Sequence, residues 1–184
     1  GVSDPGGFNL TAASYLPLFK VWQDRRLTVR VVFSLFAQRP GKELEDYQAV
    51  TQMLPMGFGD DWLRFNGIGE NVAWGMYNND NPNEGQKEQL YQIYKWAASR
   101  RMTITQHWNN NRSVHHLLDV LERVDRETPI APLRWSIAHL NDASPESLGR
   151  MKTLGVGWLM QNAMYFNGEA FLKARGNEAM RLTP

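Results

Sequence analysis

The 184-residue sequence contains no cysteine. Disulfide bonds and cysteine-ligated metal sites are therefore excluded, and any bound metal ion must be held by histidine, carboxylate or water. The cellular compartment stays open, because a chain without cysteine is compatible with both the cytosol and the periplasm. No stretch approaches the ~20 consecutive apolar residues of a membrane span, and no signal-peptide pattern is visible, so we expect no membrane partner.

The sequence also lacks an excess of charge of either sign. Its 20 basic and 19 acidic residues give a net charge of +1, and no basic stripe stands out, so we expect no nucleic-acid partner. What the sequence does have is bulky apolar surface: 42% of residues are hydrophobic, including 7 Trp, 8 Phe and 6 Tyr. Such surface must be buried to offset chain entropy, which predicts one folded domain over residues 1–184.

Helical and strand-like patterns alternate along the chain. Apolar residues at helical spacing predict helices over residues 11–26, 43–54, 85–101, 111–124, 145–154 and 168–175. Runs rich in β-branched and aromatic residues predict strands over 27–36, 63–72, 102–107, 133–139 and 156–161. Pro17 predicts a late start or a kink in the first helix. The alternation indicates the α/β class with parallel βα units. Two arrangements of such units are possible: an open doubly wound sheet and a closed (β/α)₈ barrel.

Two histidines stand at the carboxyl ends of successive predicted strands, where parallel α/β folds have their sites. His107 ends one strand and His139 ends the next, so their imidazoles are close enough to share a metal ion such as Zn²⁺. Glu70, after Gly67-Ile-Gly69, offers a carboxylate to the same ion or is a solvated loop charge. A single strand-end histidine is more often structural, so a structural role for both stays open. No G-x-G-x-x-G follows a strand, which leaves dinucleotide binding without support.

Segments around these residues follow one another in the order of a known family. They are Gly1-Val-Ser-Asp-Pro-Gly-Gly7, Gly67-Ile-Gly-Glu70, His107-Trp-Asn-Asn-Asn-Arg-Ser-Val114, Arg134-Trp-Ser-Ile-Ala-His139 and Gln161. They resemble, respectively, the end of the second strand, the approach to the fourth, the fifth-strand motif, the sixth-strand segment and the end of the seventh strand of amidohydrolase family 3. The resemblance implies a partial (β/α)₈ TIM barrel comprising about strands 3 to 7.

The resemblance also implies a function. His107, His139 and Glu70 would hold a divalent metal, expected to be Zn²⁺, and metal-activated water would hydrolyse an amide or other C–N bond. Trp108, Gln161 and Asn162 are expected to contact the small-molecule substrate. The family's first-strand His-x-His and eighth-strand Asp are absent, so we expect an incomplete site and little activity from this chain alone. Self-association is expected to cover the open sheet edges. The alternative is a non-catalytic α/β binding or assembly module with structural histidines.

Overall fold

A computed structural model describes residues 1–7 and 10–183, apart from the side chains of residues 163, 164 and 179. Its strands are β1 (Val2–Asp4), β2 (Val31–Leu35), β3 (Leu63–Glu70), β4 (Thr103–His107), β5 (Ser136–Ala138) and β6 (Gly157–Leu159). They form one sheet in chain order, and each neighbouring pair is parallel. A doubly wound sheet needs a reversal of strand order, and this sheet has none. The sheet curls into a half-barrel, which confirms the predicted partial (β/α)₈ barrel.

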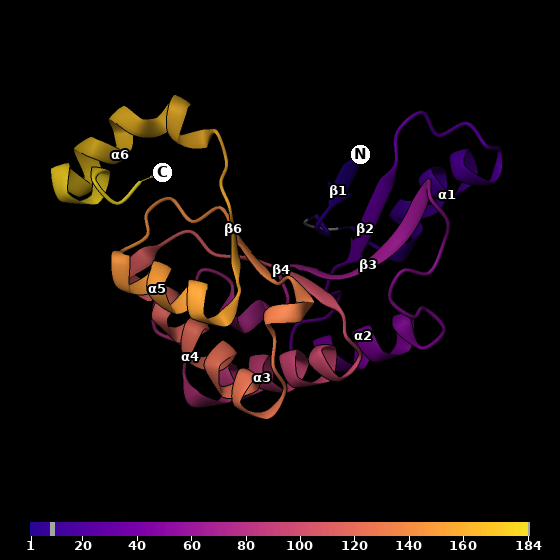
Figure 1. Ribbon diagram of the computed structural model, residues 1–184, viewed down its shortest axis with the longest axis horizontal. Coiled ribbons are helices and arrows are strands. Elements are labelled where there is room, and N and C mark those ends of the chain that lie inside the picture. The colour runs from indigo at the N-terminus through magenta and orange to yellow at the C-terminus, as the bar shows by residue number, and fades with distance from the viewer. Residues whose placement is uncertain (8–9, 184) are drawn as a thin grey trace.

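Helices connect the strands and cover the convex face of the sheet (Figure 1). The longer ones are α1 (Leu16–Gln23), α2 (Glu43–Thr51), α3 (Glu84–Ser99), α4 (Asn111–Glu127), α5 (Pro145–Leu154) and α6 (Ala163–Met180). Short 3₁₀ turns are η1 (Ala12–Tyr15), η2 (Trp74–Met76) and η3 (Ala131–Leu133). None of the described helices is long and apolar enough to cross a membrane.

The core lies between the sheet and helices α2 to α5. The apolar stripe that predicted α4 is entirely buried; it consists of Val114, Leu117, Leu118, Leu121 and Val124. Strand β4 contributes Ile104 to the same core, while Thr103 and Thr105 line a shallow cavity of about 390 Å³ on the other side of the sheet. The half-barrel therefore has an apolar convex face under helices and a polar concave face.

Several predicted boundaries differ from the structure. Strand β1 is not among the five strands predicted from periodicity, because three residues are too few to show a period, but it lies in the segment that resembles the end of the family's second strand. The strand predicted over 133–139 begins only at Ser136, since residues 131–133 form a 3₁₀ turn and Arg134 adopts a left-handed conformation (φ 56°). The first predicted helix divides into η1 and α1, with Pro17 in the first turn of α1, as its missing N–H allows.

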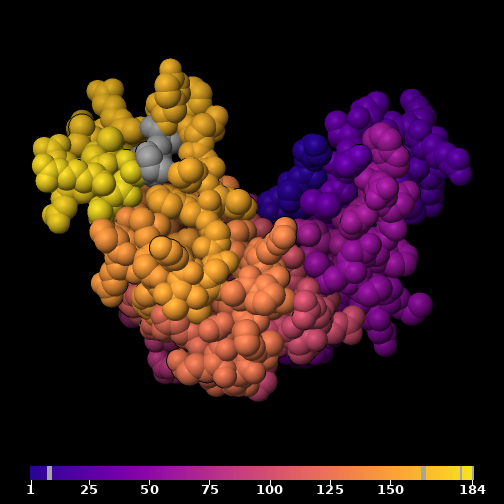
Figure 2. Space-filling view, in the orientation of Figure 1, coloured from indigo at the N-terminus to yellow at the C-terminus, as the bar shows by residue number. Residues whose placement is uncertain are grey.

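The caps of α5 agree with the sequence. The side chain of Ser144 accepts a hydrogen bond from the backbone N–H of Ser147, and Gly155 ends the helix with φ 67°. The last predicted helix, over 168–175, begins later than α6, but its predicted end is matched by a kink in α6 at Gly176, which has φ 78°. Figure 2 shows α6 at one end of the molecule, across a hollow from the N-terminal strands.

Candidate metal centre

Three neighbouring strands carry Glu70, His107 and His139 at their carboxyl ends. Glu70 is the last residue of β3, His107 is the last of β4, and His139 directly follows β5. A backbone hydrogen bond holds the ends of β4 and β5 together: the N–H of Trp108 donates to the carbonyl of Ala138 at 3.0 Å. The parallel register thus brings side chains that are 37 and 32 positions apart in sequence to one edge of the sheet.

The carboxylate of Glu70 is the meeting point of the two imidazoles. Its Oε2 lies 2.8 Å from His107 Nδ1 and 2.9 Å from His139 Nε2. The two imidazole rings are 4.5 Å apart between centroids. One donor atom from each of the three residues lies within 4.8 Å of the others. The structure therefore joins the three residues that the sequence singled out as metal ligands.

Burial and hydrogen bonding act in opposite directions on Glu70. Burial raises the pKa of its carboxyl group, but the hydrogen bonds and charges of His107 and His139 outweigh burial and lower this pKa to about 2. The hydrogen bond to Glu70 in turn raises the pKa of His139. The carboxylate is thus kept ionised at neutral pH, which is the state in which it binds a cation.

A sharp turn and a glutamine orient His139. Its backbone adopts φ 68°, a conformation that non-glycine residues rarely take, directly after β5. Its backbone N–H donates to the carbonyl of Leu159, and its Nδ1–H donates to Oε1 of Gln161 at 2.8 Å. The other ring nitrogen, Nε2, faces the carboxylate of Glu70 at 2.9 Å.

Asn78 and Tyr77 contact His107, and the sequence reasoning missed both. Asn78 Nδ2 lies 3.3 Å from His107 Nε2, and its Oδ1 accepts the N–H of Asn109 at 3.1 Å. The ring of Tyr77 lies 4.7 Å from that of His107. These residues belong to a loop that the sequence identified only as polar and rich in asparagine. No local signal marks them, since their partners lie about 30 residues further along the chain.

The expected substrate-contacting residues differ in exposure. Trp108 is fully buried, and its indole N–H donates to the hydroxyl of Ser113 at 3.1 Å, so its side chain belongs to the core rather than to an open surface. Gln161 is half-buried and is bonded to His139. Asn162 is exposed beside it. Of the three, Asn162 has the side chain most accessible to a substrate.

The donor set fits a divalent metal ion. Two imidazole nitrogens and one carboxylate oxygen are ligands that Zn²⁺ accepts in catalytic sites, with a further position left for water. Tetrahedral coordination at bonds of roughly 2.1 Å separates donor atoms by about 3.4 Å. The observed contacts of 2.8 and 2.9 Å would have to widen by about half an ångström, which is within the range of side-chain adjustment. The three residues form a candidate metal site.

Two solved structures are similar to this chain in fold. The chain is similar to the crystal structures of an uncharacterized metal-dependent hydrolase from Pyrococcus horikoshii OT3, at 18% identity and a TM-score of 0.69, and of another from Pyrococcus furiosus, at 19% and 0.68. Both similarities cover 100% of this chain, but only 37% and 38% of those chains. This likeness establishes the fold, and the chain spans less than two fifths of either structure.

The family is identified by a sequence model. Among curated proteins, none is similar enough in sequence to count as a match. The model of the amidohydrolase family, however, matches residues 1–184, the whole of the sequence. Taken with the half-barrel and the cluster at its strand ends, this match leads to one conclusion: the chain belongs to the amidohydrolase family.

Proposed function

We propose that residues 1–184 are the central part of a Zn²⁺-dependent hydrolase that cleaves amide or other C–N bonds. One observation carries the proposal: Glu70, His107 and His139 converge at the carboxyl ends of three successive parallel strands. This edge of a parallel barrel is where such folds have their active sites. The family and the metal-dependent hydrolases of similar fold support the same reaction class.

Each residue has a role that follows from its contacts. His139 Nε2, His107 Nδ1 and the carboxylate of Glu70 would hold the ion. When bound, the ion supplies Lewis acidity toward a carbonyl and toward a water nucleophile. Gln161 keeps the imidazole of His139 in the orientation and tautomer that a ligand needs. We assign contact with a small-molecule substrate to Asn162, which is exposed beside Gln161.

The proposal describes an incomplete catalytic domain. A closed barrel has eight strands, and the described residues form six. The three ligands Glu70, His107 and His139, one at each of three strand ends, form part of a metal site. We therefore expect the chain to bind zinc and to hydrolyse N-acyl compounds slowly at best.

Metal analysis of the purified chain tests the proposal. The chain is prepared without chelator, supplied with Zn²⁺, freed of excess metal, and analysed by mass spectrometry. We expect one zinc per chain, reduced severalfold in Glu70→Gln, His107→Ala and His139→Ala. His115→Ala is the matched control, because His115 is an exposed residue of α4 outside the cluster. Amine release from N-acyl amino acids, measured on the same samples, should require both zinc and Glu70.

A structural role for the histidines is the second candidate. It is favoured by the hydrogen bonds that already satisfy the cluster: His107 bonds to Glu70 and accepts from Asn78 Nδ2, and His139 bonds to Glu70 and Gln161. The two candidates differ in their response to a chelator. A metal site predicts that EDTA lowers the melting temperature of the zinc-loaded chain. Stability that is indifferent to both zinc and EDTA would favour the structural role.

A further inference from the structure

A second pocket lies at the opposite end of the sheet from the metal centre. It has a volume of about 350 Å³ and is lined by Trp22, Arg25, Leu27, Asp60 and Trp62. Trp62 directly precedes Leu63, the first residue of β3, whereas Glu70 is the last. At ~3.3 Å per residue, the length of β3 separates the two sites by roughly 23 Å. A molecule in this pocket is therefore not in contact with the candidate metal ligands.

The walls of the pocket are held in place by Asp60. Its Oδ2 accepts the indole N–H of Trp22 at 2.9 Å, and its Oδ1 accepts the backbone N–H of Trp62 at 2.8 Å and that of Leu63 at 3.0 Å. These donors, the N–H of Leu63 first, hold the pKa of Asp60 below its usual value. The carboxylate is occupied by the protein's own donors, so it is a positioning group and not a binding site for a cationic ligand.

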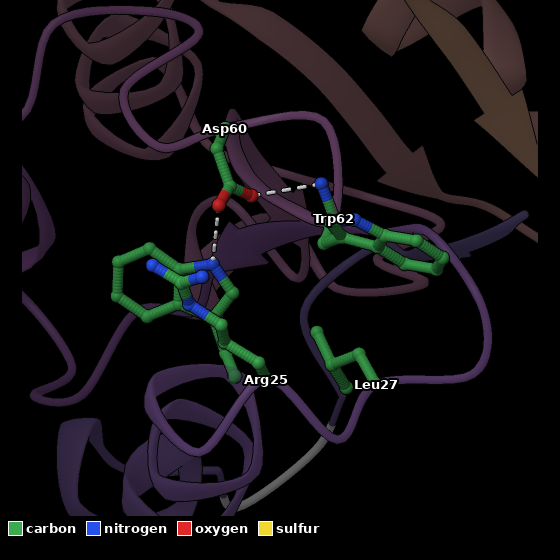
Figure 3. A pocket seen from close by; sticks show the side chains of 5 residues that line it. Arg25, Leu27, Asp60 and Trp62 are labelled. Carbon is green, nitrogen blue, oxygen red and sulfur yellow. Dashed lines mark hydrogen bonds between the residues drawn. The ribbon is translucent and has the colours of Figure 1, made fainter.

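Arg25 brings a positive charge to the pocket without a protein partner. Within the described residues, its guanidinium takes part in no ion pair or side-chain hydrogen bond, and the adjacent Asp24 pairs instead with Lys20 at 2.7 Å. Figure 3 shows Arg25 and Leu27 on the side of the pocket that faces Asp60 and Trp62. Two charged side chains line this space, and Arg25 is the positive one: the oxygens of Asp60 are taken up by N–H donors of the protein, whereas the guanidinium of Arg25 is left to bind a ligand.

The chemistry of the lining selects a class of ligand. The faces of Trp22 and Trp62 offer flat apolar surface, on which a planar ring packs well. The guanidinium of Arg25 matches the geometry of a carboxylate or phosphate. A volume near the lower limit for small-molecule sites admits one ring or two fused rings and excludes a peptide or a long chain.

We propose that this pocket binds a small planar aromatic anion, with its ring between Trp22 and Trp62 and its anionic group on Arg25. This site does not depend on zinc binding. Its test is therefore separate from the test of the proposed hydrolase function. Because the pocket is built from the end of α1 and the turn before β3, a bound ring joins these two segments. We therefore expect the ligand to stabilise the N-terminal half of the sheet.

Nuclear magnetic resonance of the tryptophan indole N–H groups tests the proposal on the full 184-residue chain. The probes are indole-3-carboxylate, its neutral isostere indole-3-carboxamide, and phenyl phosphate. Indole-3-carboxylate should shift the indole N–H signals of Trp22 and Trp62 saturably and bind more tightly than the carboxamide. Phenyl phosphate shows whether Arg25 prefers carboxylate or phosphate. The proposal is supported if either anion binds more tightly than the carboxamide.

Substitutions separate the two parts of the site. Arg25→Gln should weaken the carboxylate about threefold, as expected of an exposed ion pair, and leave carboxamide binding unchanged. Arg26→Gln is the matched control, because Arg26 does not line the pocket. Trp62→Leu should weaken both probes, and the spectrum of each variant shows whether it is folded. No saturable shift in the wild-type chain, or equal affinity for carboxylate and carboxamide that Arg25→Gln leaves unchanged, would overturn the proposal.

Discussion

The carboxamide of Gln161 is the group through which the protein selects one nitrogen of His139. Its Oε1 can only accept, so His139 Nδ1 must keep a proton to donate to it, and Nε2, 2.9 Å from the carboxylate of Glu70, is the nitrogen left to bind a metal ion. This contact brings together the ends of β5 and β6, which no short sequence window contains. Gln161 is therefore expected to raise metal affinity by orienting His139, although Gln161 itself does not contact the ion.

We predict that Gln161→Leu lowers the zinc affinity of the chain about 10- to 100-fold, the usual effect of removing a partner of a metal-binding histidine. The physical reason is that the imidazole of His139 loses both its preferred orientation and its preferred tautomer. Competition with a chelator of known affinity measures the change. Asn162→Ala serves as the control and should leave zinc affinity unaltered, whereas equal loss in both variants would argue against this role of Gln161.

Asp46 carries the clearest acid-sensitive contribution to stability outside the metal centre. Its carboxylate accepts the backbone N–H of Arg39 at 2.9 Å and Nε of Arg39 at 2.8 Å. The hydrogen bonds from the Arg39 side chain hold the pKa of Asp46 below its usual value. A carboxyl group whose pKa is lower in the folded state stabilises the fold above its unfolded pKa, and this stabilisation is lost as pH falls through the folded pKa.

The free energy of unfolding should therefore fall less steeply in Asp46→Asn than in the wild type as the pH is lowered below about 4. At neutral pH the variant should be less stable, and the difference should shrink on acidification. Urea denaturation at a series of pH values measures this. Asp24→Asn, in an exposed pair with Lys20, is the comparison variant. Parallel stability curves for Asp46→Asn and the wild type would refute the assignment.

At the scale of elements, β3 depends on a glycine. Gly67 adopts φ 139°, and a Cβ atom there would lie 2.0 Å from the carbonyl oxygen of Thr103 in β4. A side chain at this position is therefore incompatible with both the backbone conformation and the pairing of β3 with β4. Since β3 ends at Glu70, this close approach also helps to position the carboxylate of the metal centre.

Gly67→Ala should destabilise the fold by about 2 kcal/mol or more, as expected when a positive φ and a backbone contact are both violated. Gly149→Ala is the matched control, because Gly149 lies in α5 and its added Cβ would meet nothing within 4 Å. That variant should gain roughly 0.5–1 kcal/mol through helix propensity. Thermal and urea denaturation measure both changes. A neutral Gly67→Ala would show that β3 and β4 can separate at little cost.

The sequence predicts long elements better than short ones. Helix α4 could be predicted from its apolar stripe, and α5 from its caps, because both signals are local and repeated. Strands of three residues, such as β1 and β5, show too few alternations to fix their limits. The strand predicted to begin at Leu133 begins only at Ser136, because the 3₁₀ turn and the left-handed Arg134 before it leave no mark in the apolar pattern.

The candidate site could be predicted only in part. The rule that sites lie at the carboxyl ends of parallel strands selected His107 and His139 and left Glu70 open between a ligand and a solvated loop charge; the family resemblance then assigned Glu70 to the metal ion. Asn78 could not be predicted, because its contact with His107 depends on how the loop after β3 folds over the end of β4. Trp108 is buried, and Ser113 in the first turn of α4 accepts its indole N–H.

At the scale of the whole molecule, the half-barrel leaves both edges of its sheet open. Strands β1 and β6 each have a single strand partner within the part of the chain that the structure describes. Leu159 in β6 and the adjacent Met160 are 49% and 62% exposed. Unpaired backbone groups beside exposed apolar side chains favour association with another copy.

We therefore predict that the isolated chain self-associates. Light scattering over a range of concentrations should give a mass above 21.1 kDa, the mass of one chain, that rises with concentration. Leu159→Lys, which adds a charge to the open edge, should shift the equilibrium toward the monomer. Gly149→Ala, which adds only an uncharged methyl group at an exposed position of α5, should leave the mass unchanged. A monomer at every concentration would contradict this expectation.

X-ray absorption spectroscopy of the zinc-loaded chain tests the central claim most directly, because it reports the ligands around the metal itself. With Glu70, His107 and His139 as ligands, the nearest shell should contain only nitrogen and oxygen and should show the scattering pattern of two imidazoles. His139→Ala should remove one imidazole, and His115→Ala none. A wild-type spectrum without imidazole scattering, or one that is unchanged in His107→Ala and His139→Ala, would contradict the account of this edge of the sheet as a metal centre.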